Sequence, residues 1–436
     1  MSTQLKISLV FFSLAGSFIL AAHSYGTSDV YVAMEIWTRN YIDNGFWQGY
    51  WNTTSHPHFM ALIYFIVGRI VLFIGQPLGS QAHIVVLKSV SILLIQACGL
   101  LLLNIKRTNS RLLTVLLLTF LLNPVFIEHT SILGYTDAYY YIWLALSLYL
   151  SFRLSQKSDS LTIMLFFLTL VIGPFTKWEF LIYTPALFIP AAVTVIKSKS
   201  IKPALLGAFI GLVIVVVPLL ITAETWLEFS FRARGVLQAW QRITTDESFV
   251  VANFGNVWQI LNYVKTFHIS TVADFFSHLS ERFPFWWDPV IHRQGRLVFF
   301  SVFMPMALLA ALKTKVIKSN PFRLTLALVL WTNLIYVLFN TGVHENHFVV
   351  STLFAAFLMV SRWNLTSLIW YLLISWINFS TLSYFYGFGR VNMFGLTGNL
   401  NLWGLNISLV NAFLLILIFI YNLFHLVHTR DEYLGW

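Results

Sequence analysis

The chain has 436 residues, of which 58% are hydrophobic, 17% are aromatic and only 10% are charged, and this excludes an ordinary soluble protein. The formal net charge of +10 comes from small groups of Lys and Arg between apolar runs, so we expect no nucleic-acid partner. Apolar runs long enough to cross a bilayer recur throughout. We therefore predict an all-α membrane protein with a single polytopic membrane domain over residues 1–436.

Thirteen apolar runs of helical length follow one another along the chain. They cover residues 7–22, 58–75, 83–103, 112–127, 138–152, 161–175, 180–196, 204–222, 297–312, 324–340, 346–361, 365–381 and 403–427. The first run follows Lys6 and ends in two alanines, a pattern that also fits a cleavable signal peptide. We interpret it as a transmembrane helix. The single cysteine, Cys98, lies inside a run and excludes both an intrachain disulfide and a cysteine zinc site.

The short basic loops indicate that one run does not cross the membrane. If all thirteen crossed, the Lys and Arg residues around 106–111, 153–157 and 197–202 would face the opposite side from Lys6, against the positive-inside rule. Every short basic loop falls inside if run 58–75 lies at the outer surface as a juxtamembrane or re-entrant helix. We therefore expect about 12 transmembrane helices plus this outer helix, with both termini in the cytoplasm.

The acidic residues give a second, independent asymmetry, because the positive-inside rule counts only Lys and Arg. With this topology, only Asp159, Asp431 and Glu432 of the seventeen Asp and Glu residues lie inside. We therefore expect the chemistry on the outer face, under a cover formed by loops 23–82 and 223–296. The second loop mixes aromatic and charged residues, which suits either amphipathic helices on the lipid surface or a loop anchored by its tryptophans.

The first two outer segments carry most of the candidate acids. Asp29 follows the first span, and Glu35 comes six residues later. The stretch 127–143, IEHTSILGYTDAYYYIW, places Glu128, His129 and Asp137 between two apolar runs. Asp137 is also suited to cap the following helix, and a lone histidine is more often interfacial than a ligand.

The later outer segments carry candidate cations and one mixed cluster. Lys177 in GPFTKWEF lies outside, against the prevailing basic asymmetry, and its alternative interpretation is a lysine that snorkels to the interface. His344, Glu345 and His347 cluster before a span, with a spacing that matches no strong metal motif. The remaining isolated outer cations are Arg232, Arg234 and Arg390.

The order of these motifs resembles the C-superfamily (GT-C) of integral-membrane glycosyltransferases. An early outer Asp followed by an aromatic loop and HPHF resembles the first-loop pattern of that family. NPVFIEHTSILGYTD is similar to its NP…H…G..D stretch, FTKWEFLIYTPALF to its TKPQ stretch, and VHENHFVVSTLF to its HE stretch. The chain departs from the pattern in having no acidic pair at Asp29, HP for PP, KWE for KPQ, and Asn346 after HE.

The resemblance implies transfer of one mannose- or glucose-like sugar, with inversion, from a polyprenyl-phosphate donor. Asp29 takes the place of the catalytic carboxylate. No cofactor is expected, and the departures from the motif leave dependence on a divalent metal open. The membrane would be a bacterial or archaeal plasma membrane or the ER membrane, with the active site on the outer or lumenal side. The acceptor, a glycan, lipid or protein, is left open.

The same roles follow from the chemistry of the reaction. Transfer needs a base near the acceptor hydroxyl and cations near the departing phosphate. We assign the base to Asp29. The residues assigned to the donor phosphate are Lys177, Arg232, Arg234 and Arg390. The residues assigned to sugar or acceptor hydroxyls are Glu35, Glu128, His129, Asp137, His344 and Glu345.

Three other kinds of function remain as alternatives. A lipid or sugar transporter (flippase) usually has paired halves and polar or broken helices near the bilayer midplane, and neither is clear here. A polysaccharide polymerase or ligase that uses lipid-diphosphate glycans would place similar chemistry on the same face. A structural scaffold has no need of carboxylates gathered on one side.

Overall fold

Most of the chain is helical, and its long helices coincide with the apolar runs of the sequence. The computed structural model divides into two compact units, Met1–Asp246 and Glu247–Trp436, and each is described by itself. The residues described are 3–27, 30, 32–53, 56–105, 120–221, 226–245, 249–251, 255–278, 286–312, 321–343, 346–362, 364–386, 401–402 and 405–428.

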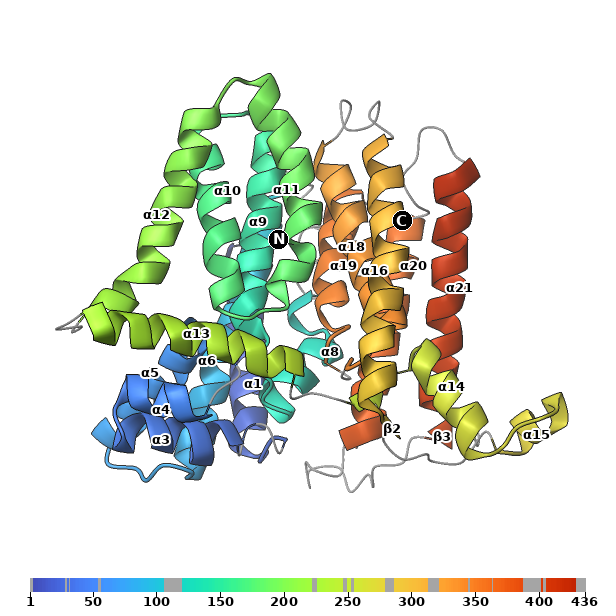
Figure 1. Cartoon of the computed structure of the whole chain (residues 1–436), viewed down its shortest axis with the longest axis horizontal. Helices are drawn as coiled ribbons and strands as arrows, with labels where there is room; N and C mark the ends of the chain where they lie inside the picture. Colours follow the sequence, from blue (N-terminus) through green and yellow to red (C-terminus); the bar gives the residue numbers. More distant parts are fainter. Residues whose placement is uncertain are drawn as a thin grey trace. The chain divides into compact units, whose positions relative to one another are not determined.

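The first unit combines long helices with a group of short ones (Figure 1). Its long helices are α1 (Thr3–Ala22), α5 (His58–Phe73), α6 (Gln81–Leu103), α9 (Ala138–Gln156), α10 (Ser160–Ile172), α11 (Phe180–Lys197), α12 (Ile201–Leu220) and α13 (Trp226–Thr245). Its short elements are the π-helices η1 (Val32–Thr38) and η2 (Ile127–Ile132), the 3₁₀ turn η3 (Gly173–Phe175), and α3 (Arg39–Asp43), α4 (Phe46–Thr53) and α8 (Pro124–Phe126).

The second unit is also built on long helices. These are α16 (Pro289–Leu312), α18 (Pro321–Phe339), α19 (Val350–Ser361), α20 (Leu365–Tyr386) and α21 (Ile407–His428), with the shorter α14 (Val257–Thr266) and α15 (Val272–Ser277). Two short antiparallel pairs complete it: β1 (Phe249–Val251) with β2 (Trp286–Trp287), and β3 (Asn401–Leu402) with β4 (Leu405–Asn406). The two tryptophans that were considered as anchors of the loop 223–296 thus form the short strand β2.

The apolar runs were predicted correctly as helices wherever the structure describes them. Twelve of the thirteen are helical over most of their length, and the run 112–127 lies largely outside the described residues. Six described helices are long and apolar enough to cross a membrane. They are Gln81–Leu103, Phe180–Lys197, Ile201–Leu220, Pro321–Phe339, Leu365–Ser383 and Ile407–His425. The protein is therefore an all-α, membrane-embedded chain.

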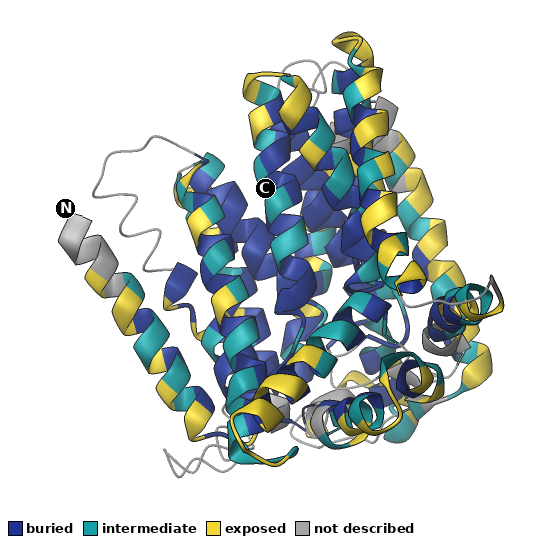
Figure 2. Cartoon of the chain, turned by 90° about the vertical axis from the view of Figure 1, so that its left-hand side faces the viewer, coloured by how far each residue is buried: buried dark blue, intermediate teal, exposed yellow. Residues whose placement is uncertain are grey.

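The helices pack closely on one side and present apolar residues on the other. Gly207 of α12 lies so close to α10 that a β-carbon there would come within 2.0 Å of the Met164 carbonyl oxygen, and one at Gly211 would meet Val171. Leu205 and Phe209, on the opposite side of α12, are exposed. Figure 2 shows this division along the long helices, with buried inner faces and exposed outer faces. Exposed apolar side chains on such a helix suit contact with lipid.

Both regions predicted to lie at the outer surface, the run 58–75 and the loop 223–296, contain helices. Helix α5 has 16 residues, which at about 1.5 Å per residue is shorter than the hydrocarbon core of a bilayer. It packs against η1, α3, α4 and α6. Helix α13 runs across the ends of the long helices of the first unit (Figure 1). The predicted loop 223–296 ends earlier than expected, because α16 already begins at Pro289.

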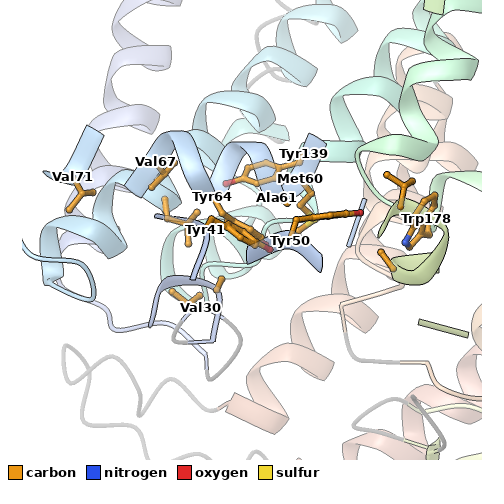
Figure 3. Close-up of a cluster of buried hydrophobic side chains, with 14 of the residues drawn as sticks. Val30, Tyr41, Tyr50, Met60, Ala61, Tyr64, Val67, Val71, Tyr139 and Trp178 are labelled. Atoms are coloured by element: carbon orange, nitrogen blue, oxygen red, sulfur yellow. The ribbon is translucent and has the colours of Figure 1, made fainter. Parts of the chain in front are cut away.

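A buried aromatic cluster connects the short helices to α9. Tyr41, Tyr50, Tyr64 and Tyr139 gather there with Trp178 at its margin (Figure 3). Aromatic rings bury large apolar areas, and tyrosine hydroxyls need hydrogen-bond partners when they are buried. The Tyr64 hydroxyl lies 2.9 Å from Oγ1 of Thr136, and the Tyr50 hydroxyl donates to the His56 carbonyl oxygen at 2.9 Å. The cluster therefore ends in polar contacts close to Asp137.

Candidate functional site

The first unit contains a buried group of charged side chains, which we call the ionic cluster: His129, Asp137, Lys177 and Glu179. Lys177 Nζ donates to Asp137 Oδ1 and lies 3.4 Å from Glu179 Oε1. Nε2 of His129 lies 3.1 Å from the other Asp137 oxygen, Oδ2. The exposed fractions of His129, Asp137 and Lys177 are 0%, 2% and 7%. Burial of charged groups is tolerated where they pair closely or where their hydrogen bonds are satisfied.

A tight turn after η2 brings Asp137 back to His129. In this π-helix the Leu133 N–H donates to the Glu128 carbonyl oxygen at 2.8 Å, and the chain then turns at Gly134, whose φ is +77°. Glycine adopts this left-handed conformation without strain. A β-carbon at Gly134 would also lie 2.7 Å from Val30 and 2.8 Å from the Lys88 stem. The turn therefore requires glycine for both its conformation and its packing.

Lys177 reaches the cluster from the connection between α10 and α11. Helix α10 ends at Gly173-Pro174, and η3 turns the chain. The ring of Phe180 approaches Gly173 so closely that a β-carbon there would lie 2.5 Å from it. The Lys177 ammonium lies 5.6 Å from the centre of the Tyr140 ring, within the range of a cation–π interaction. Residues forty positions apart in the sequence thus form the central ion pair.

Aromatic rings hold the imidazole of His129 in place. Its ring is stacked between those of Tyr135 and Tyr141, at centroid distances of 5.1 and 5.8 Å. The Tyr135 N–H donates to the His129 carbonyl oxygen at 2.9 Å. Nδ1 of His129 is buried and makes no hydrogen bond within the described part of the chain. The ring orientation is therefore fixed by stacking and by Asp137.

The pair of Asp137 and Lys177 is held in its charged form. Burial acts to raise the pKa of Asp137, but the charge of Lys177 and the hydrogen bond from His129 outweigh it and place the pKa well below its usual range. Burial likewise acts to lower the pKa of Lys177, but Asp137 and Glu179 outweigh it and raise the pKa above its ordinary value. Both shifts favour a carboxylate and an ammonium.

His56 lies within electrostatic range of the same pair. Burial, and then the charge of Lys177, lower its pKa to about 3, so its imidazole is neutral at pH 7. Its ring lies edge-on to that of Trp37 at a centroid distance of 4.7 Å. His56 was not among the sequence candidates. The only indication of it in the sequence is its position beside Pro57, just before the predicted outer helix.

The structure bears on the alternative interpretations of three residues. Asp137 occupies the N-cap position of α9, as the capping interpretation predicts, but its side chain makes no capping hydrogen bond and pairs with Lys177 and His129 instead. Lys177 is buried and ion-paired, so it is not a snorkelling lysine. His129 is fully buried and pairs with a carboxylate, so it is not an interfacial histidine.

The other described candidates lie apart from these contacts. Glu35 forms an exposed ion pair with Arg39 at 2.9 Å, one helical turn along the chain. Glu128 is buried on η2. Arg232 is buried, donates to the carbonyl oxygens of Leu219 and Ile221 at 3.1 and 2.6 Å, and lies over the Trp47 ring. Arg234 is exposed.

Four candidates lie outside the described residues: Asp29, His344, Glu345 and Arg390. The predictions made for them stay predictions. Among the described residues, no group of three or more His, Cys, Asp or Glu side chains is arranged to hold a metal ion.

Two further charged residues were missed at the sequence level. Glu179 lies in the motif GPFTKWEF, two residues after Lys177, and was assigned no role, although it contacts Lys177. Lys88 lies inside the apolar run 83–103 and is fully buried. An ionisable residue inside a membrane span is a strong sign of function, and this rule would have selected Lys88.

The cluster is suited to binding hydroxyl groups. Carboxylate, ammonium and imidazole groups all form hydrogen bonds with hydroxyls, and the neighbouring tyrosines add hydroxyl donors. Comparison with protein-family models and with curated proteins finds no match to this chain.

Proposed function

We propose that the protein is an inverting GT-C-type glycosyltransferase in the membrane. It transfers one mannose- or glucose-like sugar from a polyprenyl phosphate to an acceptor at the outer or lumenal face. Asp29 accepts the proton of the acceptor hydroxyl, whose oxygen attacks the anomeric carbon. The bond from that carbon to the phosphate oxygen breaks, and polyprenyl phosphate departs with the electron pair.

The ionic cluster beside the first outer segment is the observation that carries this proposal. The described residues that flank position 29 are Thr27 and Val30. The Thr27 N–H donates to the Leu133 carbonyl oxygen at 2.9 Å, and Val30 packs against Gly134. Both contacts fall on the turn that leads to Asp137. The segment that carries the proposed base therefore adjoins the segment that carries the cluster.

The contacts also divide the roles among the other candidates. Lys177 is held by two carboxylates and Arg232 by two carbonyl oxygens, so we assign contact with the donor phosphate first to Arg234 and Arg390. We assign His129 and Asp137 to the hydroxyls of the sugar or acceptor, since a buried carboxylate and imidazole orient hydroxyls well. Lys177 keeps Asp137 ionised for that task.

The proposal includes a topology with twelve crossings and α5 at the outer surface. It is tested with single cysteines at Asn52, Ser80 and Asn109 in a Cys98→Ser background. An impermeant thiol reagent should label the first two from the outer side and the third only from the inner side. Labelling of positions 52 and 80 from opposite sides would show that α5 crosses and would remove the outer site.

The activity is tested with purified protein in lipid nanodiscs. The donors are polyprenyl-phosphate mannose, polyprenyl-phosphate glucose and a diphosphate-linked glycan, and mass spectrometry measures the release of polyprenyl phosphate. We expect release from a monophosphate donor, and a loss of about a hundred- to ten-thousandfold in Asp29→Asn with donor binding retained. Transfer only from the diphosphate donor would favour a polymerase or ligase. Movement of intact lipid across the bilayer without release would favour a flippase.

A further inference from the structure

Lys88 makes contacts that no role described so far explains. It lies in the first half of α6, among apolar residues, and is fully buried. Its Nζ donates to the Ser24 carbonyl oxygen at 2.9 Å, to Ser24 Oγ at 2.7 Å and to the Ile132 carbonyl oxygen at 2.9 Å. An ammonium group has three N–H donors, so all three are used. Within the described part of the chain, Lys88 pairs with no carboxylate.

The acceptors of Lys88 belong to two different segments. Ser24 lies two residues after the end of α1, and Ile132 is the last residue of η2. The Ile132 carbonyl group, like the last ones of any helix, lacks a partner inside the helix and carries partial negative charge, so a cation satisfies it. A buried ammonium is costly to desolvate. An apolar residue at position 88 would avoid that cost but would leave both segments without this donor.

Further hydrogen bonds join residues 24–27 to residues 131–134. The Ser24 hydroxyl accepts from Lys88 and donates to the Ser131 carbonyl oxygen at 2.9 Å. The Thr27 N–H donates to the Leu133 carbonyl oxygen at 2.9 Å. The stem of Lys88 also lies against Gly134. Lys88 is therefore at the centre of the contact between the start of the first outer segment and the turn before Asp137.

We propose that Lys88 is a positioning residue, which holds residues 24–27 against residues 131–134 and so sets the first outer segment relative to the ionic cluster. This inference rests on the proposed function, in which Asp29 is the base. Lys88 acts only through the carbonyl oxygens of Ser24 and Ile132 and through the Ser24 hydroxyl. It sets the distance between the base and the hydroxyl-binding group. A shift of about 1 Å between reacting groups is enough to lower turnover about a hundredfold.

The test compares Lys88→Met with a matched control on the same helix. Gln96 is also buried on α6 but bonds α1 itself, through Ser13 Oγ at 3.2 Å, two turns farther from the first outer segment. Gln96→Leu should therefore lose a buried hydrogen bond of the same helix without releasing residues 24–27. Both variants are made with Cys98→Ser and Thr27→Cys, since Thr27 is buried and its labelling by an impermeant maleimide reports detachment of the segment.

We expect Lys88→Met to raise the labelling rate at position 27 about tenfold, because hydrogen bonds from a charged donor are lost. Without the Thr27 reporter, the same variant should lower kcat about tenfold to a hundredfold and leave KM for the donor within about twofold. Gln96→Leu should change neither quantity. If Lys88→Met does not yield folded protein, Ser24→Ala removes only the bridging hydroxyl and should shift both quantities in the same direction by less.

The two measurements separate this inference from the proposed function. Unchanged labelling in Lys88→Met would overturn the holding role, and faster labelling with unchanged kcat would overturn the positioning role. If the unsubstituted protein transfers no sugar from any polyprenyl phosphate, the proposed function and the positioning role fail together. The labelling rate still decides in that case whether Lys88 holds the segment.

Discussion

The two units of the molecule bury polar groups in different ways. The first unit buries charges, with Asp137, Lys177 and Lys88 among apolar helices. In the second unit, the polar groups buried between the described helices are mainly amides and hydroxyls. Asn378 Nδ2 donates to Thr352 Oγ1 at 3.0 Å and so joins α20 to α19. Asn411 Nδ2 donates to Thr381 Oγ1 at 2.9 Å and joins α21 to α20.

The difference lies in what the buried groups cost to desolvate. Neutral amides hold helices together at little desolvation cost, which is what association in a membrane requires. Buried charges cost far more to desolvate, and they add little to helix association that amides do not supply. The second unit therefore uses polar groups as structural links. The first unit retains buried charges in spite of their higher cost, and this supports the role that we propose for the ionic cluster.

The largest expected effect comes from breaking the central ion pair. Lys177→Met leaves Asp137 and Glu179 buried without their cation, and we expect the free energy of unfolding to fall by about 3–5 kcal/mol. The measurement is an SDS unfolding titration in mixed micelles. The double variant Lys177→Met, Asp137→Leu should recover much of the loss, because the more deeply buried carboxylate is then gone and only Glu179 lacks its cation. A double variant as unstable as the sum of the single ones would show that the two side chains do not interact.

The next effect concerns the close packing of α12 against α10 in the first unit. Gly207→Leu would force α12 away from the Met164 backbone, and we expect a loss of about 1–3 kcal/mol. Gly16→Leu is the matched control, because a β-carbon at Gly16 has no neighbour within 4 Å among the described residues. Equal stability of the two variants would mean that α10 and α12 do not approach as closely as described.

A smaller effect is expected from the amide links of the second unit. Asn411→Leu removes hydrogen bonds between α20 and α21 and should cost about 0.6 kcal/mol and at most about 1.7 kcal/mol. Because no charge is left behind, sugar transfer should stay within about twofold of the unsubstituted protein. A loss of transfer as large as that in Asp29→Asn would show that Asn411 does more than link two helices.

The sequence predicts the helices of both units well because their cause is local. Long apolar runs bounded by Gly, Pro or charged residues are enough to define a helix such as α11 or α18 within a few residues. The π-helix η2 is not predictable in this way, since its hydrogen bonds do not follow the 3.6-residue period. The start of α16 was also missed, because its first turns carry charged and polar residues.

The ionic cluster was predictable only in part. Glu128, His129 and Asp137 stand out as polar residues between apolar runs, and Lys177 stands out as a basic residue on the outer side. The pairing of Asp137 with Lys177 depends on how η3 packs against α9, which no local pattern contains. Lys88 was overlooked because a single charge scarcely changes the mean hydropathy of a long run.

The smallest expected effect is the response of the ion pair to pH. The folded state lowers the pKa of Asp137 below its unfolded value of about 3.9, so its stabilising contribution is present above about pH 4 and is lost as the pH falls. The folded state raises the pKa of Lys177 above about 10.4, so its contribution is present below that pH and is lost as the pH rises. The stability difference between the unsubstituted protein and the double variant Lys177→Met, Asp137→Leu should therefore be constant from about pH 5 to pH 9 and fall below about pH 4. The difference for Asn411→Leu, which involves no charge, should be constant over the whole range.

SDS titrations at pH 3.5, 5, 7 and 9 measure both differences. A difference for the double variant that changes steadily between pH 5 and 9 would mean that the pair is not fully charged at neutral pH, and the contrast between a charged and a neutral unit would then be wrong.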